Sequence, residues 1–390
     1  MSMRHTTSDI CFLAPVPFFQ QLLADSQGIC SGGAEVQMAM IGRGLAERGI
    51  RVSYLVYRTG GPRIQMFNGR MKLVGAYRPR GGVSGLRYVS ETLPGMLSGL
   101  HLADAAVYYA RGASGLAGLV AAYARARRRA FVFAVSSDRD VSPRGLRQLL
   151  KLHDRVLFGA GMRRADAILV QTDDQRARLR QHFHRDGLLM PSLCHRFPAQ
   201  VEAGGGHTVL WAGRARGMKR PLMFLDLARS CPGVQFVMAL SDRKTDPVLA
   251  DRVINEAKHI SNLKLLIDVP YREMSGHFDD AAVLVNTSEY EGFPNTFLEA
   301  WAVGRPVVAT VNPDGLLTRN RLGLHVHDLE GSTHAVTELM ASPERRREIG
   351  LRARELVGGR HSREAVLNAY IEVITQAAQG YGLRIGGGDG

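Results

Sequence analysis

Short apolar runs rich in β-branched residues alternate with helix-period segments along most of the chain. This alternation is typical of parallel α/β sheets, in which a helix connects each strand to the next parallel strand. Residues 10–19 are expected to form the first buried strand, residues 34–48 a helix closed by Gly49, and residues 51–57 the second strand. The N-terminal region is therefore predicted to form one βαβ unit.

The same alternation continues toward the C-terminus, with one interruption. Residues 191–206 lose the periodicity and contain two prolines and three consecutive glycines, which is typical of a domain boundary. We therefore expect two Rossmann-like domains, over residues 1–197 and 206–361. The further elements expected are strands at 105–109, 131–135, 167–171, 208–211, 234–240, 263–269, 282–286 and 307–310, and helices at 172–183, 221–230, 343–357 and 362–378.

Basic residues are concentrated in the first half of the chain. Residues 1–200 carry 28 Lys and Arg against 13 Asp and Glu, whereas residues 201–390 carry 22 against 23. A basic half suits an anionic membrane surface, a phosphorylated ligand or nucleic acid, and a solubilising surface explains it equally well. Nucleic acid is disfavoured, because the sequence contains no finger, basic zipper or Gly/aromatic RNA-binding motif.

Composition also bears on the compartment. The four cysteines lie at least 19 positions apart, so neither a CxxC motif nor a disulfide framework is indicated. No apolar run approaches the roughly 20 residues that span a bilayer. A reducing, cytoplasmic location fits these features.

Ligands of an open parallel sheet bind beyond the carboxyl ends of its strands, and three predicted loops there have informative residues. The first places Gly32 and Gly33 before a helix, where backbone N–H groups can approach an anion, although a loop capped by Ser31 is an equally good explanation. The second, residues 213–220, has four cations. Such a group suits a diphosphate, with a solvated charged loop as the alternative.

The third loop, within residues 286–300, carries the most information. A strand ends, Glu291 follows in the loop, a helix begins near Asn295 or Thr296, and Glu299 lies about one turn inside that helix. The two carboxylates therefore flank a helix N-terminus whose N–H groups can hold phosphates, and they can bind sugar hydroxyls. For Glu299 a capping box with Thr296 is a structural alternative. No equivalent alternative accounts for Glu291 and residues 292–295.

Residues 291–310, EGFPNTFLEAWAVGRPVVAT, resemble the E-x7-E donor-site signature of the retaining glycosyltransferases of family 4, which have the GT-B fold. Residues 213–219, GRARGMK, resemble that family's phosphate-binding loop, and residues 31–37, SGGAEVQ, its N-terminal Gly-Gly loop. Residues 165–179, ADAILVQTDDQRARL, resemble the segment before the interdomain linker. The resemblance implies an α/β fold of two facing Rossmann-like domains with parallel sheets, in which the last helix, residues 362–380, crosses back to the first domain.

The resemblance also implies roles for individual residues. Glu299 is expected to bind the ribose hydroxyls of a nucleotide sugar, Glu291 the transferred sugar, and Arg214 with Lys219 the diphosphate. The remaining donor-binding residues are expected to be Gly32 and Gly33, approaching from the other domain, and Gly292, Phe293, Pro294, Asn295 and Thr296. The donor is expected to be UDP- or GDP-linked, and no metal or other cofactor is expected.

The implied activity is transfer of a sugar, with retention, to a glycan or lipid-linked acceptor in polysaccharide or glycolipid assembly. The basic half and the lack of an anchor favour peripheral contact with the anionic inner face of the cell membrane, and nucleic acid is not expected as a partner. Alternatives are a GT-B epimerase or phosphorylase, and a sugar-nucleotide-binding regulatory protein without turnover.

The sequence departs from the family pattern after the strand at 131–135. Many members have a histidine in the catalytic cleft there, whereas this chain reads Ser136-Ser137-Asp138-Arg139-Asp140, so Asp138 is expected to replace it. The same Asp-x-Asp run matches the metal-binding motif of GT-A glycosyltransferases, because carboxylates are suitable Mg²⁺ or Mn²⁺ ligands. That interpretation leaves the second half of the chain unexplained and is not favoured.

Overall fold

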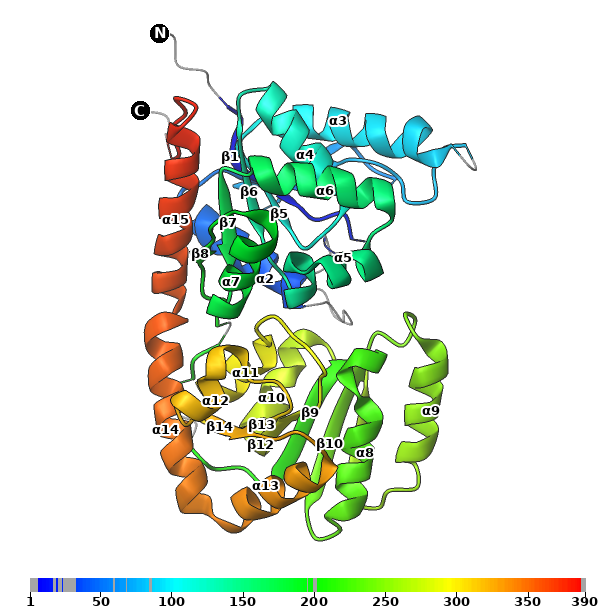
Figure 1. The fold of residues 1–390 in the computed structure, drawn as a ribbon, viewed down its shortest axis with the longest axis vertical. Coiled ribbons are helices and arrows are strands. Elements are labelled where there is room, and N and C mark those ends of the chain that lie inside the picture. The colour runs from blue at the N-terminus through cyan, green and yellow to red at the C-terminus, as the bar shows by residue number, and fades with distance from the viewer. Residues whose placement is uncertain are drawn as a thin grey trace. The chain divides into compact units, whose positions relative to one another are not determined.

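The computed structural model describes residues 6–16, 19, 23, 33–58, 60–67, 69–83, 86–194, 196–198 and 202–386. The chain divides into two compact units, each built on its own β-sheet (Figure 1). The first unit contains Met1–Asp25, Gly32–Leu193 and Arg363–Gly390, and the second contains Ser26–Ser31 and Cys194–Ser362.

The first unit has an eight-stranded sheet in the order β3-β4-β2-β1-β5-β6-β7-β8. Neighbouring strands are parallel except β3 and β4, which are antiparallel. The order reverses between β1 and β5, as in a doubly wound sheet. The strands are β1 (Ser8–Leu13), β2 (Val52–Val56), β3 (Ile64–Phe67), β4 (Met71–Gly75), β5 (Ala105–Arg111), β6 (Ala130–Ala134), β7 (Ala167–Val170) and β8 (Leu188–Leu189).

The first strand is shorter than expected. It ends at Leu13 rather than extending to residue 19, and Pro15 follows outside the strand. Proline has no N–H to donate to a neighbouring strand. The segment is therefore apolar beyond Leu13 but does not continue the strand there.

Helices cover both faces of the first sheet and form a separate core on each. On one face α2 and α15 pack against the strands, and on the other α3, α4, α6 and α7 do so. The helices of this unit are α2 (Gly33–Glu47), α3 (Leu93–Ala103), α4 (Gly115–Ala126), α5 (Pro143–Leu149), α6 (Leu152–Arg164), α7 (Asp173–Phe183) and α15 (Arg363–Gln379).

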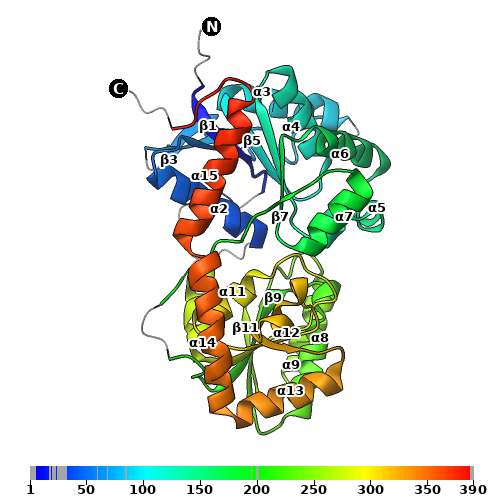
Figure 2. The same cartoon turned by 60° about the vertical axis from the view of Figure 1, so that its left-hand side comes forward.

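The last helix belongs to the first unit although it ends the chain. Six buried side chains of α15 join the core formed by β1, β2, β5 and α2, and Figure 2 shows α15 lying along this sheet. They are Val366, Leu367, Tyr370, Val373, Ile374 and Ala378. The expected crossing of the C-terminal helix to the first domain is therefore confirmed.

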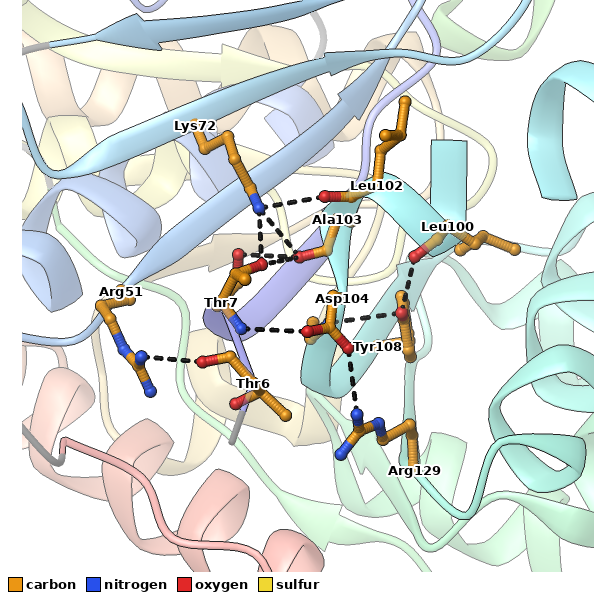
Figure 3. A network of polar contacts seen from close by, with 12 residues as sticks. Thr6, Thr7, Arg51, Lys72, Leu100, Leu102, Ala103, Asp104, Tyr108 and Arg129 are labelled. Carbon is orange, nitrogen blue, oxygen red and sulfur yellow. Dashed lines mark hydrogen bonds and ion pairs between the residues drawn. The ribbon is translucent and has the colours of Figure 1, made fainter. Parts of the chain in front are cut away.

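Polar contacts close the amino ends of the first sheet (Figure 3). The Asp104 carboxylate accepts a hydrogen bond from the Thr7 N–H at 3.2 Å and pairs with the Arg129 guanidinium at 3.0 Å. The Lys72 ammonium donates to the Thr7 hydroxyl at 2.9 Å and to two carbonyls at the end of α3. Burial lowers the pKa of Lys72. These groups satisfy the amino edge internally, which leaves the opposite edge for ligands.

The second unit has a six-stranded sheet in the order β11-β10-β9-β12-β13-β14, with every neighbouring pair parallel. The order reverses between β9 and β12, which defines the crevice where ligands of doubly wound sheets bind. The strands are β9 (Thr208–Arg214), β10 (Gln235–Ser241), β11 (Leu263–Ile267), β12 (Ala281–Asn286), β13 (Val307–Ala309) and β14 (Gly323–His325).

Seven helices of the described chain surround the second sheet, with one core on each face. They are α8 (Pro221–Ser230), α9 (Pro247–Ala257), α10 (Met274–Asp280), α11 (Asn295–Ala302), α12 (Leu316–Arg319), α13 (Leu329–Ala341) and α14 (Pro343–Arg360). The buried Arg305 donates to the carbonyls of Glu202 at 2.7 Å and Asp279 at 2.6 Å. Arg305 thereby joins the start of this unit to the end of α10.

Candidate functional site

The loops that follow β9 and β12 meet at the point where the strand order of the second sheet reverses. The Thr287 hydroxyl donates to the Lys219 carbonyl at 2.7 Å, and the Glu289 N–H donates to the Met218 carbonyl at 2.9 Å. The Arg220 guanidinium donates to the Thr287 carbonyl at 2.6 Å. The two loops therefore form one hydrogen-bonded structure, and one of the four expected phosphate-facing cations, Arg220, is used inside it.

This arrangement brings together Lys219 and Glu291, which lie 72 positions apart in the sequence and form an ion pair. The Glu291 carboxylate also accepts a hydrogen bond from the Ser288 hydroxyl at 2.7 Å. The side chains remain 24% and 12% exposed, respectively, so both are accessible at the carboxyl edge of the sheet. A cation for phosphate and a carboxylate for hydroxyl groups thus occupy adjacent positions.

Arg214, the last residue of β9, faces the end of β10. Its guanidinium lies 3.9 Å from the Asp242 carboxylate, and Arg216 approaches the same carboxylate to 3.3 Å. Asp242 was not predicted as a site residue. Its position directly after β10 was the available signal, because it places a charge at the same carboxyl edge.

Glu299 lies in α11, which begins at Asn295 as predicted. The N-cap residue of this helix is Pro294 and no side chain caps it, so the alternative of a Thr296–Glu299 capping box was wrong. Instead, the Glu299 carboxylate accepts a hydrogen bond of 2.6 Å from the Tyr271 hydroxyl. Burial raises the pKa of Glu299 to about 7, and the Tyr271 hydrogen bond opposes that rise.

Tyr271 is a site residue that the sequence analysis missed. It follows β11 within the short helix η4 (Tyr271–Glu273), and it meets α11 only because the two loops lie at one edge of the sheet. Its pKa is raised well above the ordinary value by burial and by the Glu299 charge. The phenol therefore stays protonated and remains a hydrogen-bond donor.

The segment between the two glutamates is largely buried. The Phe293 ring stacks on the His361 ring at a centroid distance of 5.2 Å, and Gly292 and Pro294 are also buried. Asn295 and Thr296 begin the first turn of α11, where the Phe297 N–H donates to the Pro294 carbonyl at 3.1 Å.

The remaining predicted residues belong to the first unit. Asp138 begins the short helix η2 (Asp138–Val141) and accepts a hydrogen bond from the Gln175 amide at 3.1 Å. Asp140 is 2% exposed and accepts 2.7 Å bonds from the Ser136 N–H and hydroxyl, so this carboxylate braces its own loop. Gly33 is the exposed first residue of α2, whereas Gly32 lies outside the described residues.

The described part of the chain contains no cluster of three or more His, Cys, Asp or Glu side chains arranged to hold a metal ion. In the Asp-x-Asp run, one oxygen of the Asp140 carboxylate accepts hydrogen bonds from Ser136 and Ser137 within the loop.

Two families match the chain, one in each unit. Residues 32–190 match the family described as "Glycosyl transferase 4-like domain", and residues 206–342 match "Glycosyl transferases group 1". The lipopolysaccharide core biosynthesis glycosyltransferase LpsE of Rhizobium meliloti (strain 1021) is 34% identical over 96 residues. That match covers 24% of this chain and 28% of the relative, so it spans well under two thirds of the relative's length.

Two solved structures share the architecture over almost the whole chain. Sucrose-phosphate synthase from Thermosynechococcus elongatus superposes with a TM-score of 0.78 at 18% identity, over 95% of this chain and 100% of that one. WaaG, a glycosyltransferase involved in lipopolysaccharide biosynthesis, superposes with a TM-score of 0.63 at 14% identity, over 94% of this chain and 99% of that one. At these identities the likeness establishes the fold.

The two sheets, with charged loops at a strand-order reversal, define a protein with the GT-B fold, as the sequence analysis expected. Both units also match glycosyltransferase families, so the chain combines two domains that are each similar to glycosyltransferase domains.

Proposed function

We propose that this chain is a retaining glycosyltransferase that uses a UDP- or GDP-linked sugar donor and requires no metal. The observation that carries the proposal is the meeting of the loops after β9 and β12, which hold Lys219 and Glu291, at the edge where the second sheet reverses its strand order. Arg214 ends β9 at this edge, and Glu299 lies in α11, the helix that follows β12. Cations, carboxylates and a helix N-terminus within one crevice match the phosphates, hydroxyls and leaving group of a nucleotide sugar.

In this proposal Glu299 accepts hydrogen bonds from the ribose hydroxyls and Glu291 from the transferred sugar. Arg214 and Lys219 neutralise the diphosphate, and the first-turn N–H groups of α11 add their partial positive charge. Lys219 is paired with Glu291 in the free protein. The Glu291 carboxylate therefore already holds the Lys219 ammonium in place when the donor phosphate binds. Phosphate and sugar contacts are thereby coupled.

The chemical step then needs stabilisation of a leaving diphosphate and of an oxocarbenium-like centre. Positioned cations and helix N–H groups supply that stabilisation without a protein nucleophile. We propose front-face attack, in which a diphosphate oxygen takes the acceptor proton and the configuration at the anomeric carbon is kept. Asp138 is proposed to take the place of the cleft histidine, and Gly33 to contribute to donor binding.

The proposed acceptor is a glycan or a lipid-linked glycan used in polysaccharide or glycolipid assembly. The name of the related LpsE, a lipopolysaccharide core enzyme, supports this class. The basic first half of the chain supports peripheral contact with the anionic inner face of the cell membrane. Within the described residues, no helix is both long and apolar enough to cross a bilayer.

A thermal-shift screen against UDP, GDP, ADP, dTDP and CMP, with their common sugar conjugates, tests the donor site. A ligand that binds only the folded protein must raise its apparent stability, so the screen reports binding and base preference together. We expect a shift with one nucleotide family, and a loss of about 1–3 kcal/mol of donor binding in Glu299→Ala.

Two outcomes would contradict the proposal. Unchanged donor affinity in Glu299→Ala would remove the ribose assignment. Donor binding without turnover on any acceptor would instead indicate a regulatory protein. Product analysis by NMR, which reports the anomeric configuration, tests retention, and activity in excess EDTA tests independence from metal.

A further inference from the structure

The first unit exposes two apolar stripes away from both of its cores. The helical segment that includes η1 (Tyr88–Thr92) and α3 exposes Leu86, Val89 and Leu97 at 62%, 65% and 39%. The start of α6 exposes Leu152 and Val156 at 69% and 62%. Leu152 and Val156, four residues apart, lie on one side of α6, and Leu86 and Val89 are three residues apart at the start of the η1 segment. A helix of a soluble domain normally turns such a stripe toward the core.

The two stripes lie on one face of the unit. The Asp154 carboxylate of α6 is close enough to the Tyr88 hydroxyl of η1 to help raise the pKa of Tyr88, with burial as the larger cause. Both helices also pack beside α4, and Figure 1 shows the start of α3 and the junction of α5 and α6 at the same edge of the unit. We call the exposed residues Leu86, Tyr88, Val89, Leu149, Leu152 and Val156 the η1–α6 face.

Exposed cations surround the η1–α6 face. Near η1 the loop of residues 78–83 folds onto the helix through a 3.0 Å bond from the Val83 N–H to the Ser90 hydroxyl. In the described part of the chain, none of the surrounding cations forms an ion pair with a carboxylate. They are Arg78, Arg80, Arg87, Arg144, Arg147 and Lys151.

We infer that the η1–α6 face docks the protein onto an anionic phospholipid bilayer. The aliphatic and tyrosine side chains enter the boundary between headgroups and acyl chains, while the surrounding Arg and Lys side chains reach the lipid phosphates. The inference deepens the proposed function and rests on its membrane-linked acceptor.

Charge selects the bilayer over other occupants of this face. A symmetric contact between two copies of this chain would bring the same unpaired cations together, which is unfavourable. Nucleic acid presents phosphates but offers no apolar layer for the leucine and valine stripes. An anionic bilayer satisfies both kinds of side chain at once.

Vesicle co-sedimentation of the full chain tests the inference. We compare phosphatidylcholine vesicles with vesicles containing about one third phosphatidylglycerol, at low and at high salt. The test variant is Val89→Glu with Val156→Glu. The matched control is Val248→Glu with Leu351→Glu, two valine or leucine positions on helices of the second unit that are 79% and 55% exposed.

We expect binding to the anionic vesicles at low salt, and a drop of about tenfold or more in the partition coefficient for the test variant but not for the control. Arg147→Gln with Lys151→Gln should weaken binding to anionic vesicles only. Unchanged donor affinity and an unchanged unfolding midpoint show that each variant is folded.

Three results would overturn the inference. If the wild-type protein does not bind anionic vesicles, the bilayer is not its partner. Sugar transfer to a soluble acceptor would in that case still support the glycosyltransferase proposal. Wild-type binding that the test variant retains moves docking to another surface. A dimer in sedimentation equilibrium that the test variant dissociates makes the η1–α6 face an interface between copies.

Discussion

Glu299 combines a raised pKa with a proposed role that needs the ionised form. Burial moves its pKa from the ordinary 4.5 to about 7. Ribose hydroxyls donate hydrogen bonds, and a carboxylate accepts them more strongly than a carboxylic acid does. The donor affinity of this site is therefore tied to a titration near neutrality.

We predict that donor affinity rises as the pH increases through about 7, because the folded protein then loses the Glu299 proton. Glu299→Gln, which cannot ionise, should bind more weakly and show a flatter pH profile. Isothermal titration calorimetry about one unit below and one unit above this pKa provides the measurement. Identical pH profiles for both proteins would contradict the assignment.

The same shift predicts how stability depends on pH. Because the pKa of Glu299 is raised on folding, the folded protein holds a proton that the unfolded chain has lost between about pH 4.5 and 7. The contribution of Glu299 to the free energy of unfolding is fully present below that window and is lost as the pH rises through it. Urea unfolding of the wild type and Glu299→Gln across this range measures the difference, and a steeper fall in the variant would be contradictory.

Tyr271 acts on the site through Glu299. Tyr271→Phe removes the hydroxyl that opposes the rise in the pKa of Glu299, so that pKa should increase further. We predict a donor affinity about three- to tenfold lower near pH 7, and a pH profile displaced upward. Tyr381→Phe, which removes a 2.9 Å bond to Asp166 in the first unit, is the control and should leave both unchanged. A loss of affinity without displacement of the profile would indicate a structural effect only.

At the scale of elements, glycine determines how closely α4 and α6 pack. A Cβ atom on Gly118 would lie 2.2 Å from the Leu157 carbonyl oxygen, and one on Gly161 would lie 3.0 Å from the Gly118 Cα. The two backbones therefore touch. The position of α6, and with it half of the η1–α6 face, depends on this contact.

We predict that Gly118→Ala destabilises the first unit by about 1–3 kcal/mol, because the backbone of α6 must move. Gly159→Ala in α6 is the matched control. Its Cβ would approach only the end of the Arg163 side chain at 3.7 Å, so the better helix propensity of alanine should prevail. Denaturant unfolding measures both, and equal stabilities would show that the two helices separate without cost.

At the scale of the whole molecule, the end of the chain stabilises its beginning. Leu367 of α15 is 1% exposed and lies against Gly44 of α2, so residues more than 300 positions apart share one core. In the described part of the second unit, both cores are built from residues between Cys194 and Ser362.

We predict that Leu367→Ala destabilises the first unit by about 2–5 kcal/mol through the cavity it creates. Hydrogen exchange should accelerate for the amides of β1 and β5, while those of β9 and β10 keep their wild-type protection. Leu351→Ala on the exposed side of α14 serves as the control and should change neither. Uniform acceleration across both sheets would contradict independent stability of the two units.

Local sequence determined the elements and the places where ligand groups gather. The predicted range of α8 agrees with the structure at both ends, and α11 begins where Pro294-Asn295 indicated, because capping and periodicity involve neighbours within about one turn. The charged loops after β9 and β12 could also be predicted from the sequence, because a loop between a strand and the following helix lies at the carboxyl end of that strand.

Only the tertiary structure decided which of those groups are partners. The ion pair of Lys219 with Glu291 and the bond of Tyr271 to Glu299 both follow from strand order, which brings together loops far apart in sequence. From the sequence, Arg220 was predicted to be a phosphate ligand like its neighbours, but in the structure its guanidinium donates to the Thr287 carbonyl. Val89 and Val156 are likewise exposed in the tertiary structure. From their apolar character alone, both residues would have been assigned to the core.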